Sequence, residues 1–175
     1  METKQAGDIM IPLDRYPHIP HWYTLRQAIA ELRASQIEVQ GRLSLPRAVL
    51  VFSKTYELLG IVRRRDILRG LAPSFLVGGS QDYERRLFDV QVDPNLSDFS
   101  SDKMTRAIRA QAERPVSEVM VPITATVRSD DHLMKIVHEM VKHDLSLIPV
   151  IKDGRVVGVV RSVDLLNEIS DIVLS

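Results

Sequence analysis

The stretch VVGVVRSVDLL at Val156–Leu166 repeats, without a gap, the pattern of LLGIVRRRDIL at Leu58–Leu68. Each copy combines an apolar, β-branched run around a central glycine with a polar segment and an aspartate, which is typical of a strand that passes directly into a helix. Self-similarity of this kind predicts two structural units of one design within the chain.

A second repeat opens each unit. DIMIP at Asp8–Pro12 is echoed by EVMVP at Glu118–Pro122. The openings lie further apart than the closings, so the first unit carries extra residues inside it. Proline, histidine and glycine punctuate the segments Asp14–His21 and Gln40–Arg47, and we expect the extra residues to form loops there.

The elements between the repeats follow from periodicity. In the second unit, apolar residues from Leu133 to Val141 recur at helical spacing after Ser129-Asp130-Asp131, and two β-branched runs flank an Asp-Gly turn. The expected order of each unit is therefore helix, strand, strand, helix, with a further short extended piece after its Met-Ile/Val-Pro opening. The ranges are 25–34, 48–52, 58–62 and a helix from 66 in the first unit, and 133–141, 147–151, 156–160 and a helix from 162 in the second.

The fold class predicted is α/β (α+β), because units this small bury their apolar faces only by packing sheet against sheet, here about a pseudo-two-fold axis. We divide the chain into a first unit at 1–71, a partly helical connection at 72–114 and a second unit at 115–175. Within the connection, Ser100-Ser101 before 102–113 and Pro115 after it predict a helix, and we expect the apolar residues 75–79 to rest against the core or a partner.

Composition excludes several functions. Lys+Arg and Asp+Glu both number 23, so no overall charge attracts nucleic acid, and there is no cysteine for a disulfide or thiolate zinc site. The sequence has no signal peptide and no apolar run long enough for a membrane span, which predicts a cytoplasmic protein. Neither short catalytic motifs nor metal-ligand spacing of the histidines is present, so we expect neither an enzyme nor a metal site.

The repeated residues resemble a known family. Met-Val-Pro at 120–122, Leu147–Ile151, the Asp-Gly turn and Val157–Leu166 are similar to the CBS motif from end to end, and Gly60–Leu68 matches the same motif in the first unit. The chain thus resembles a stand-alone tandem CBS-domain (Bateman) module. This resemblance implies a regulatory homodimer that binds AMP, ADP, ATP or S-adenosylmethionine between its two motifs, needs no obligatory cofactor and acts on a partner that the sequence does not identify.

The resemblance also implies the site. Asp66 and Asp164 would accept hydrogen bonds from ribose hydroxyls, at helix N-termini that also favour phosphate. The purine would lie against four apolar residues: Ile123, Ile148, Pro149 and Val150.

One position in each motif departs from the family pattern. Arg63 and Arg161 stand where the family often has Thr or Ser, and with Ser162 they are candidates to bind phosphate, which would allow polyphosphate ligands. The alternatives are that both aspartates only stabilise helix termini, and that the protein is a ligand-free interaction or dimerisation module.

Overall fold

The computed structural model describes residues 4–72 and 101–175. The apolar residues 75–79 of the connection lie outside the described residues. The helix expected near its end is present as α4 (Ser101–Gln111), which packs against α3 (Arg64–Leu71).

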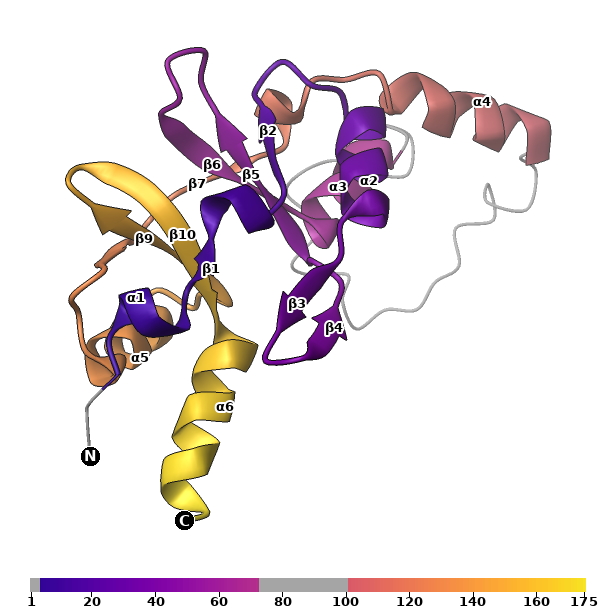
Figure 1. Cartoon of the computed structure of the whole chain (residues 1–175). Coiled ribbons are helices and arrows are strands. Elements are labelled where there is room, and N and C mark those ends of the chain that lie inside the picture. The colour runs from indigo at the N-terminus through magenta and orange to yellow at the C-terminus, as the bar shows by residue number, and fades with distance from the viewer. Residues whose placement is uncertain (1–3, 73–100) are drawn as a thin grey trace.

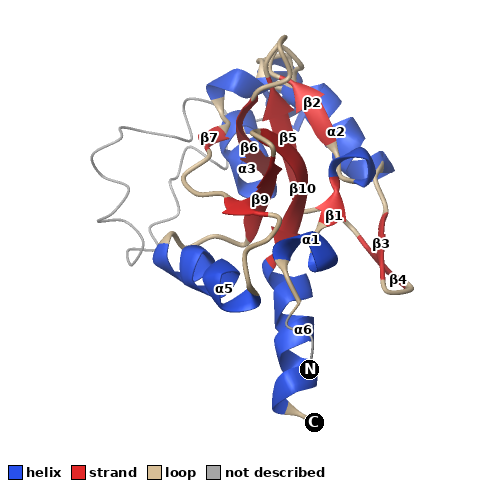
Figure 2. Ribbon diagram, turned by 60° about the vertical axis from the view of Figure 1, so that its left-hand side comes forward, coloured by secondary structure: helices blue, strands red, loops and turns tan. Residues whose placement is uncertain are grey.

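Two four-stranded sheets form the centre of the molecule (Figures 1 and 2). The first has the order β2-β5-β6-β7 and packs on α2 and α3; the second has the order β1-β10-β9-β8 and packs on α1, α5 and α6. Their elements are β2 (His18–Pro20), α2 (Leu25–Ala34), β5 (Ala48–Phe52), β6 (Leu58–Arg63), β7 (Val121–Pro122), α1 (Ala6–Ile9), β1 (Ile11–Pro12), β8 (Val127–Arg128), α5 (Leu133–Lys142), β9 (Leu147–Lys152), β10 (Arg155–Arg161) and α6 (Ser162–Val173), with 3-10 turns at Leu13–Arg15 and Val116–Glu118. The predicted α/β class and the order of elements are confirmed.

The opening strands cross between the units. β1 pairs antiparallel with β10, placing Pro12 opposite Gly158, and β7 pairs in the same way with β6, placing Pro122 opposite Gly60. Each opening segment therefore completes the sheet of the other unit. The boundaries at 1–71 and 115–175 remain a prediction about the repeats in sequence, because in space the two units share strands.

Glycine is needed where these strands cross. A Cβ atom on Gly60 would lie 2.5 Å from the backbone oxygen of Val121, and one on Gly158 would lie 2.5 Å from the backbone oxygen of Ile11. Contacts that short do not occur in folded proteins, so the central glycine of each repeat is what allows the partner strand to approach.

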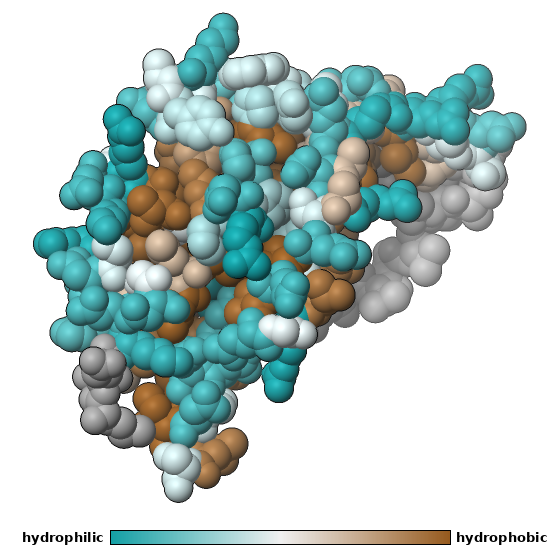
Figure 3. All heavy atoms as spheres, viewed as in Figure 1, coloured by the Kyte–Doolittle hydropathy of each residue, from teal (hydrophilic) through white to brown (hydrophobic). Residues whose placement is uncertain are grey.

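Three apolar clusters hold the fold together. One lies under the helices of each unit and includes residues of the crossed segment, Ala6 and Ile9 in the second unit and Val116 and Val119 in the first. The third is the seam between the sheets, formed by Ile11, Tyr16, Ile37, Leu50, Phe52, Ile61, Leu147 and Val159. Polar side chains cover most of the face in Figure 3, and apolar groups are exposed at the free end of α6.

The extra residues of the first unit do not form the expected loops. β2 runs parallel to β5 as β8 runs parallel to β9, so β2 belongs to the repeat itself. The remaining insertion is a hairpin of β3 (Ile37–Val39) and β4 (Arg42–Ser44), which pair with each other and with no other strand among residues 4–72 and 101–175. The turn residues Gln40 and Gly41, with φ of 51° and 75°, reverse the chain, so the signal taken for a loop marks a hairpin turn.

Tyr16 provides a test of the seam. Its side chain is buried, its hydroxyl donates to the backbone oxygen of Ala48 at 2.9 Å, and burial raises the pKa of the phenol well above its ordinary value. The unfolded state therefore releases this proton first as the pH rises above about 10, and stability falls from there. Tyr16→Phe should cost about 1 kcal/mol at neutral pH and should flatten the alkaline loss of stability, measured by urea unfolding across pH. An unchanged alkaline slope would contradict this assignment.

Candidate ligand groove between the two units

Asp164 lies in the first turn of α6, where β10 passes into the helix, and its side chain is only 6% exposed. Arg161 grips it with two hydrogen bonds, from Nε to Oδ2 at 2.6 Å and from Nη2 to Oδ1 at 2.8 Å. The third guanidinium nitrogen, Nη1, donates to the hydroxyl of Ser44 on β4 at 2.7 Å. The aspartate of the second unit is thus linked through one arginine to the inserted hairpin of the first.

Asp66 occupies the equivalent position on α3 and is fully buried. Arg63 donates to it from its backbone nitrogen at 2.9 Å, from Nε at 2.8 Å and from Nη2 at 3.0 Å, and Arg69 adds a contact at 3.0 Å. Burial alone would raise the pKa of this carboxyl, but the hydrogen bonds and charges of Arg63 and Arg69 outweigh it and lower the pKa below its usual range.

Both arginines that were candidates for phosphate are therefore engaged by aspartates. The helix starts are also occupied: the backbone nitrogens of Ser162 and Arg64 donate to the carbonyl oxygens of Ser146 and Arg47 at 2.9 and 3.1 Å. In this arrangement the helix termini have fewer free hydrogen-bond donors for a phosphate than the sequence indicated. The spacing of three residues between arginine and aspartate, which suits a contact across a helix start, was a readable signal of this pairing.

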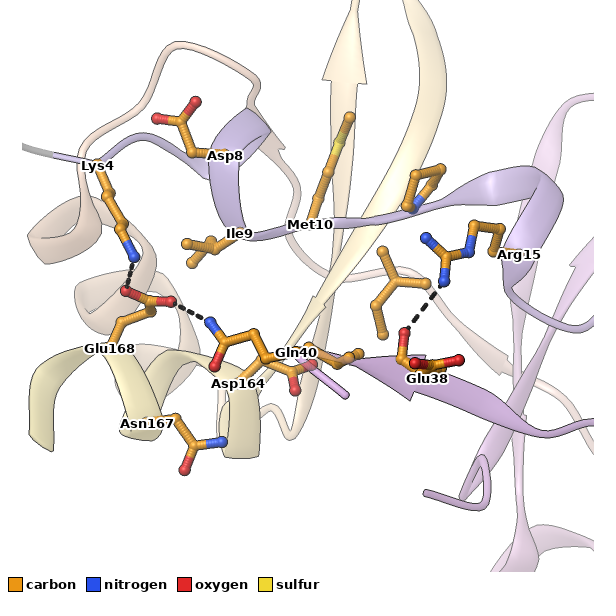
Figure 4. Close-up of a pocket in the computed structure, with 13 residues that line it drawn as sticks. Lys4, Asp8, Ile9, Met10, Arg15, Glu38, Gln40, Asp164, Asn167 and Glu168 are labelled. Atoms are coloured by element: carbon orange, nitrogen blue, oxygen red, sulfur yellow. Dashed lines mark hydrogen bonds and ion pairs between the residues drawn. The ribbon is translucent and has the colours of Figure 1, made fainter. Parts of the chain in front are cut away.

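A groove with a volume of about 200 Å³ borders Asp164 (Figure 4). The opening segment that crossed from the first unit forms one side, the first turns of α6 form another, and the β3–β4 hairpin forms a third. The lining residues are Lys4, Asp8, Ile9, Met10, Ile11, Pro12, Arg15, Glu38, Val39, Gln40, Asp164, Asn167 and Glu168. Carboxylates outnumber the cations Lys4 and Arg15 in this lining.

The four residues expected against the purine lie in the apolar clusters of the fold. Ile148 and Val150 are fully buried in the cluster under the helices, Pro149 is buried opposite Val159 in the ladder, and Ile123 packs on the seam cluster. None of them lines the groove at Asp164. The apolar wall there comes from the crossed segment Ile9–Pro12, which the sequence analysis had treated only as the opening of the first unit.

Among residues 4–72 and 101–175, no group of three or more histidine, cysteine, aspartate or glutamate side chains could hold a metal ion. Over the same residues, no helix combines the length and apolar character that crossing a bilayer demands.

The second unit matches a known family model. Residues 116–171 match the family model of the CBS domain. This segment, about a third of the chain, is a CBS domain. A search of curated proteins finds no match for it.

Solved structures of CBS-domain proteins share the fold of the described residues. The CBS domain of a CBS-domain-containing membrane protein from Sphaerobacter thermophilus is 21% identical with a TM-score of 0.61, over 94% of this chain and 87% of that one. CBSX2 in complex with AMP is 15% identical with a TM-score of 0.61, over 97% and 98%. The cytosolic domain of the Mg2+ channel MgtE in complex with ATP is 20% identical with a TM-score of 0.58, over 94% and 48%.

CBS domains are generally regulatory modules rather than enzymes, and two of these structures hold an adenine nucleotide.

Proposed function

We propose that this protein is a tandem CBS-domain sensor, which binds an adenosine-containing nucleotide between its two units and passes the signal on as a change in their relative orientation. The observation that carries the proposal is the groove at Asp164, where a buried carboxylate at a helix start meets a strand from the other unit. A ligand seated there touches both halves, so its affinity depends on how they are arranged.

The Asp164 carboxylate can still accept hydrogen bonds from a ribose. An ionised carboxylate offers about four acceptor positions, and Arg161 uses one on each oxygen of Asp164. The free positions can accept hydrogen bonds from a ribose diol while Ile11 and Pro12 give an apolar wall for a base.

The acidic lining of the groove predicts which ligands bind more tightly. Carboxylates of Asp8, Glu38 and Glu168 lie in the same lining, and each additional phosphate would increase repulsion with them. We therefore expect AMP or the cationic S-adenosylmethionine to bind better than ATP, in contrast to the polyphosphate tolerance that the arginines indicated in the sequence.

Thermal unfolding with AMP, ADP, ATP, S-adenosylmethionine and NAD tests this proposal, with UMP as the control for phosphate and ribose without adenine. A ligand present at about 100 times its dissociation constant stabilises the fold by about 2.7 kcal/mol. We expect AMP or S-adenosylmethionine to raise the midpoint and UMP to leave it unchanged. If no adenine compound shifts the midpoint at millimolar concentration, a ligand-free interaction module becomes the better account.

We also propose that two copies pair through the helices of the second unit. α5 and α6 expose an apolar stripe that comprises Met134, Val141, Val163, Leu166, Ile172 and Val173. The exposed charges on α5 are those of Lys135 and Lys142, whereas α6 exposes Asp171, so α5 of one copy complements α6 of the other. The corresponding face of α2 is polar, with Arg26, Gln27 and Arg33 exposed.

Leu166→Asp should convert this dimer to a monomer, because it places a charge in an apolar contact. Light scattering during gel filtration measures the mass, and Leu43→Asp, at an exposed apolar residue of the hairpin, is the matched control. A wild-type protein that is monomeric at every concentration would rule out the pairing.

A further inference from the structure

The β3–β4 hairpin is the main feature that distinguishes the first unit from the second. It is inserted between α2 and β5, whereas α5 and β9 are joined by a short turn. Only Ile37, at its base, is buried, at 2% exposure in the seam cluster, and from there the hairpin extends beside the start of α6 (Figure 1).

Polar contacts hold the hairpin across the groove. Gln40, at the turn, donates from Nε2 to Oε1 of Glu168 at 2.9 Å, and Glu168 also pairs with Lys4 (Figure 4). Ser44 accepts the 2.7 Å hydrogen bond from Arg161, the arginine that grips Asp164. The hairpin thus bonds to the helical turns that carry the proposed ligand carboxylate.

The closed groove is too small for a nucleotide. Its volume is about 200 Å³, whereas ligand sites usually measure about 300 to 1,000 Å³. Glu38, Val39 and Gln40 form part of its wall, so the space is enlarged most directly by moving them.

The hairpin is suited to movement. Its two strands pair with no other strand in the described part of the chain, and its turn is exposed. An isolated two-stranded hairpin is marginally stable in water. Displacement breaks the contacts of Gln40 and Ser44, the 3.2 Å hydrogen bond that Arg15 Nη2 donates to the backbone oxygen of Glu38, and the packing of Val39 on the seam cluster, while the buried Ile37 keeps the base attached.

We propose that the β3–β4 hairpin is an intramolecular lid that closes the Asp164 groove, and that a nucleotide binds there only when the lid is displaced. This inference rests on the proposed function. Closing of the hairpin and binding of the nucleotide then exclude each other. A change that weakens the lid contacts therefore lowers the equilibrium constant for closing and raises the affinity for the nucleotide by the same factor. The lid also makes the two aspartate sites unequal, because the hairpin bonds to α6 and not to α3.

The first experiment removes the lid contacts. The double variant Gln40→Ala, Ser44→Ala should bind AMP about tenfold more tightly than the wild type, because each change deletes one hydrogen bond to a charged group. Isothermal titration calorimetry measures the affinity. Leu43→Ser, which alters an exposed side chain of the same hairpin, should bind like the wild type.

The second experiment fixes the lid. The chain has no cysteine, so Gln40→Cys with Glu168→Cys creates a single reactive pair. A cleavable bifunctional thiol reagent that joins the pair should abolish AMP binding, and reduction should restore it.

The outcomes separate the two proposals. If the wild type binds AMP, but the double variant binds it equally well and the linked protein still binds it, the lid is ruled out and the sensor function stands. If neither the wild type nor the double variant binds any adenine nucleotide, the sensor function fails and the lid fails with it.

Discussion

Asp66→Ala should lower the free energy of unfolding by about 3 kcal/mol, the lower end of the range for breaking a buried ion pair, because Asp66 is fully buried whereas Arg63 is one-third exposed. The carboxylate is fully buried and receives hydrogen bonds from Arg63 and Arg69, so its loss leaves Arg63 without its partner. Urea unfolding followed by circular dichroism measures the effect. Asp130→Ala is the control, because its ion pair with Arg128 is exposed and should contribute at most about 1 kcal/mol.

The pH dependence of stability at acid pH provides a second measurement on the same variant. Because the pKa of Asp66 is lowered in the folded protein, its contribution is present above the ordinary pKa of about 4 and is lost as the pH falls through the folded value. Asp66→Ala should therefore make the stability profile flatter at acid pH. If Asp66→Ala is as stable as Asp130→Ala and loses stability at acid pH as the wild type does, the pairing of Arg63 with a buried Asp66 is contradicted.

Asp164 requires a more conservative substitution, because it too is paired with an arginine. Asp164→Ala would leave Arg161, which is 11% exposed, without its carboxylate, so a loss of ligand could follow from a loss of structure. Asp164→Asn keeps the shape and one acceptor, and the affinity for AMP should fall while the fold persists.

Gly158→Ala should destabilise the fold by about 3 kcal/mol, at the upper end of the range for overpacking. The new methyl group would lie 2.5 Å from the backbone oxygen of Ile11 and 2.9 Å from the sulfur of Met10, so the crossed strand must move. Arg155→Ala, on the exposed end of the same strand, is the control and should change stability little.

Amide hydrogen exchange identifies which strand pairing is disrupted in Gly158→Ala. The amide of Ile11 should lose protection in Gly158→Ala, because the β1–β10 pairing is disrupted. Unfolding within about 0.5 kcal/mol of the control, with Ile11 still protected, would show that the strands do not cross at this distance.

The sequence predicted the elements well where local chemistry decides them. The gapless repeat predicted both strand-to-helix passages, and the Asp-Gly turn predicted the β9–β10 hairpin, where Asp153 and Gly154 have φ of 50° and 74°. The crossing of β1 and β7 was not readable, because a glycine within a strand indicates a close neighbour without saying which segment supplies it.

The site was harder to predict because it depends on that crossing. Ile148 and Val150 alternate with Leu147 and Pro149 along β9, and the apolar run does not reveal which face meets the helices. Once Ile9–Pro12 crosses to the second sheet, it and the inserted hairpin border Asp164 instead. The aspartates themselves were identified from the repeat, and their pairing with arginines three residues earlier is a local contact.

A crystal structure of the protein grown with AMP tests the central claim most directly. The account predicts adenosine at the seam between the units, with its ribose hydroxyls within hydrogen-bond distance of the Asp164 carboxylate and with the contact between Gln40 and Glu168 broken. AMP bound away from the seam, while the hairpin stays closed and both carboxylates keep only their arginines, would contradict it.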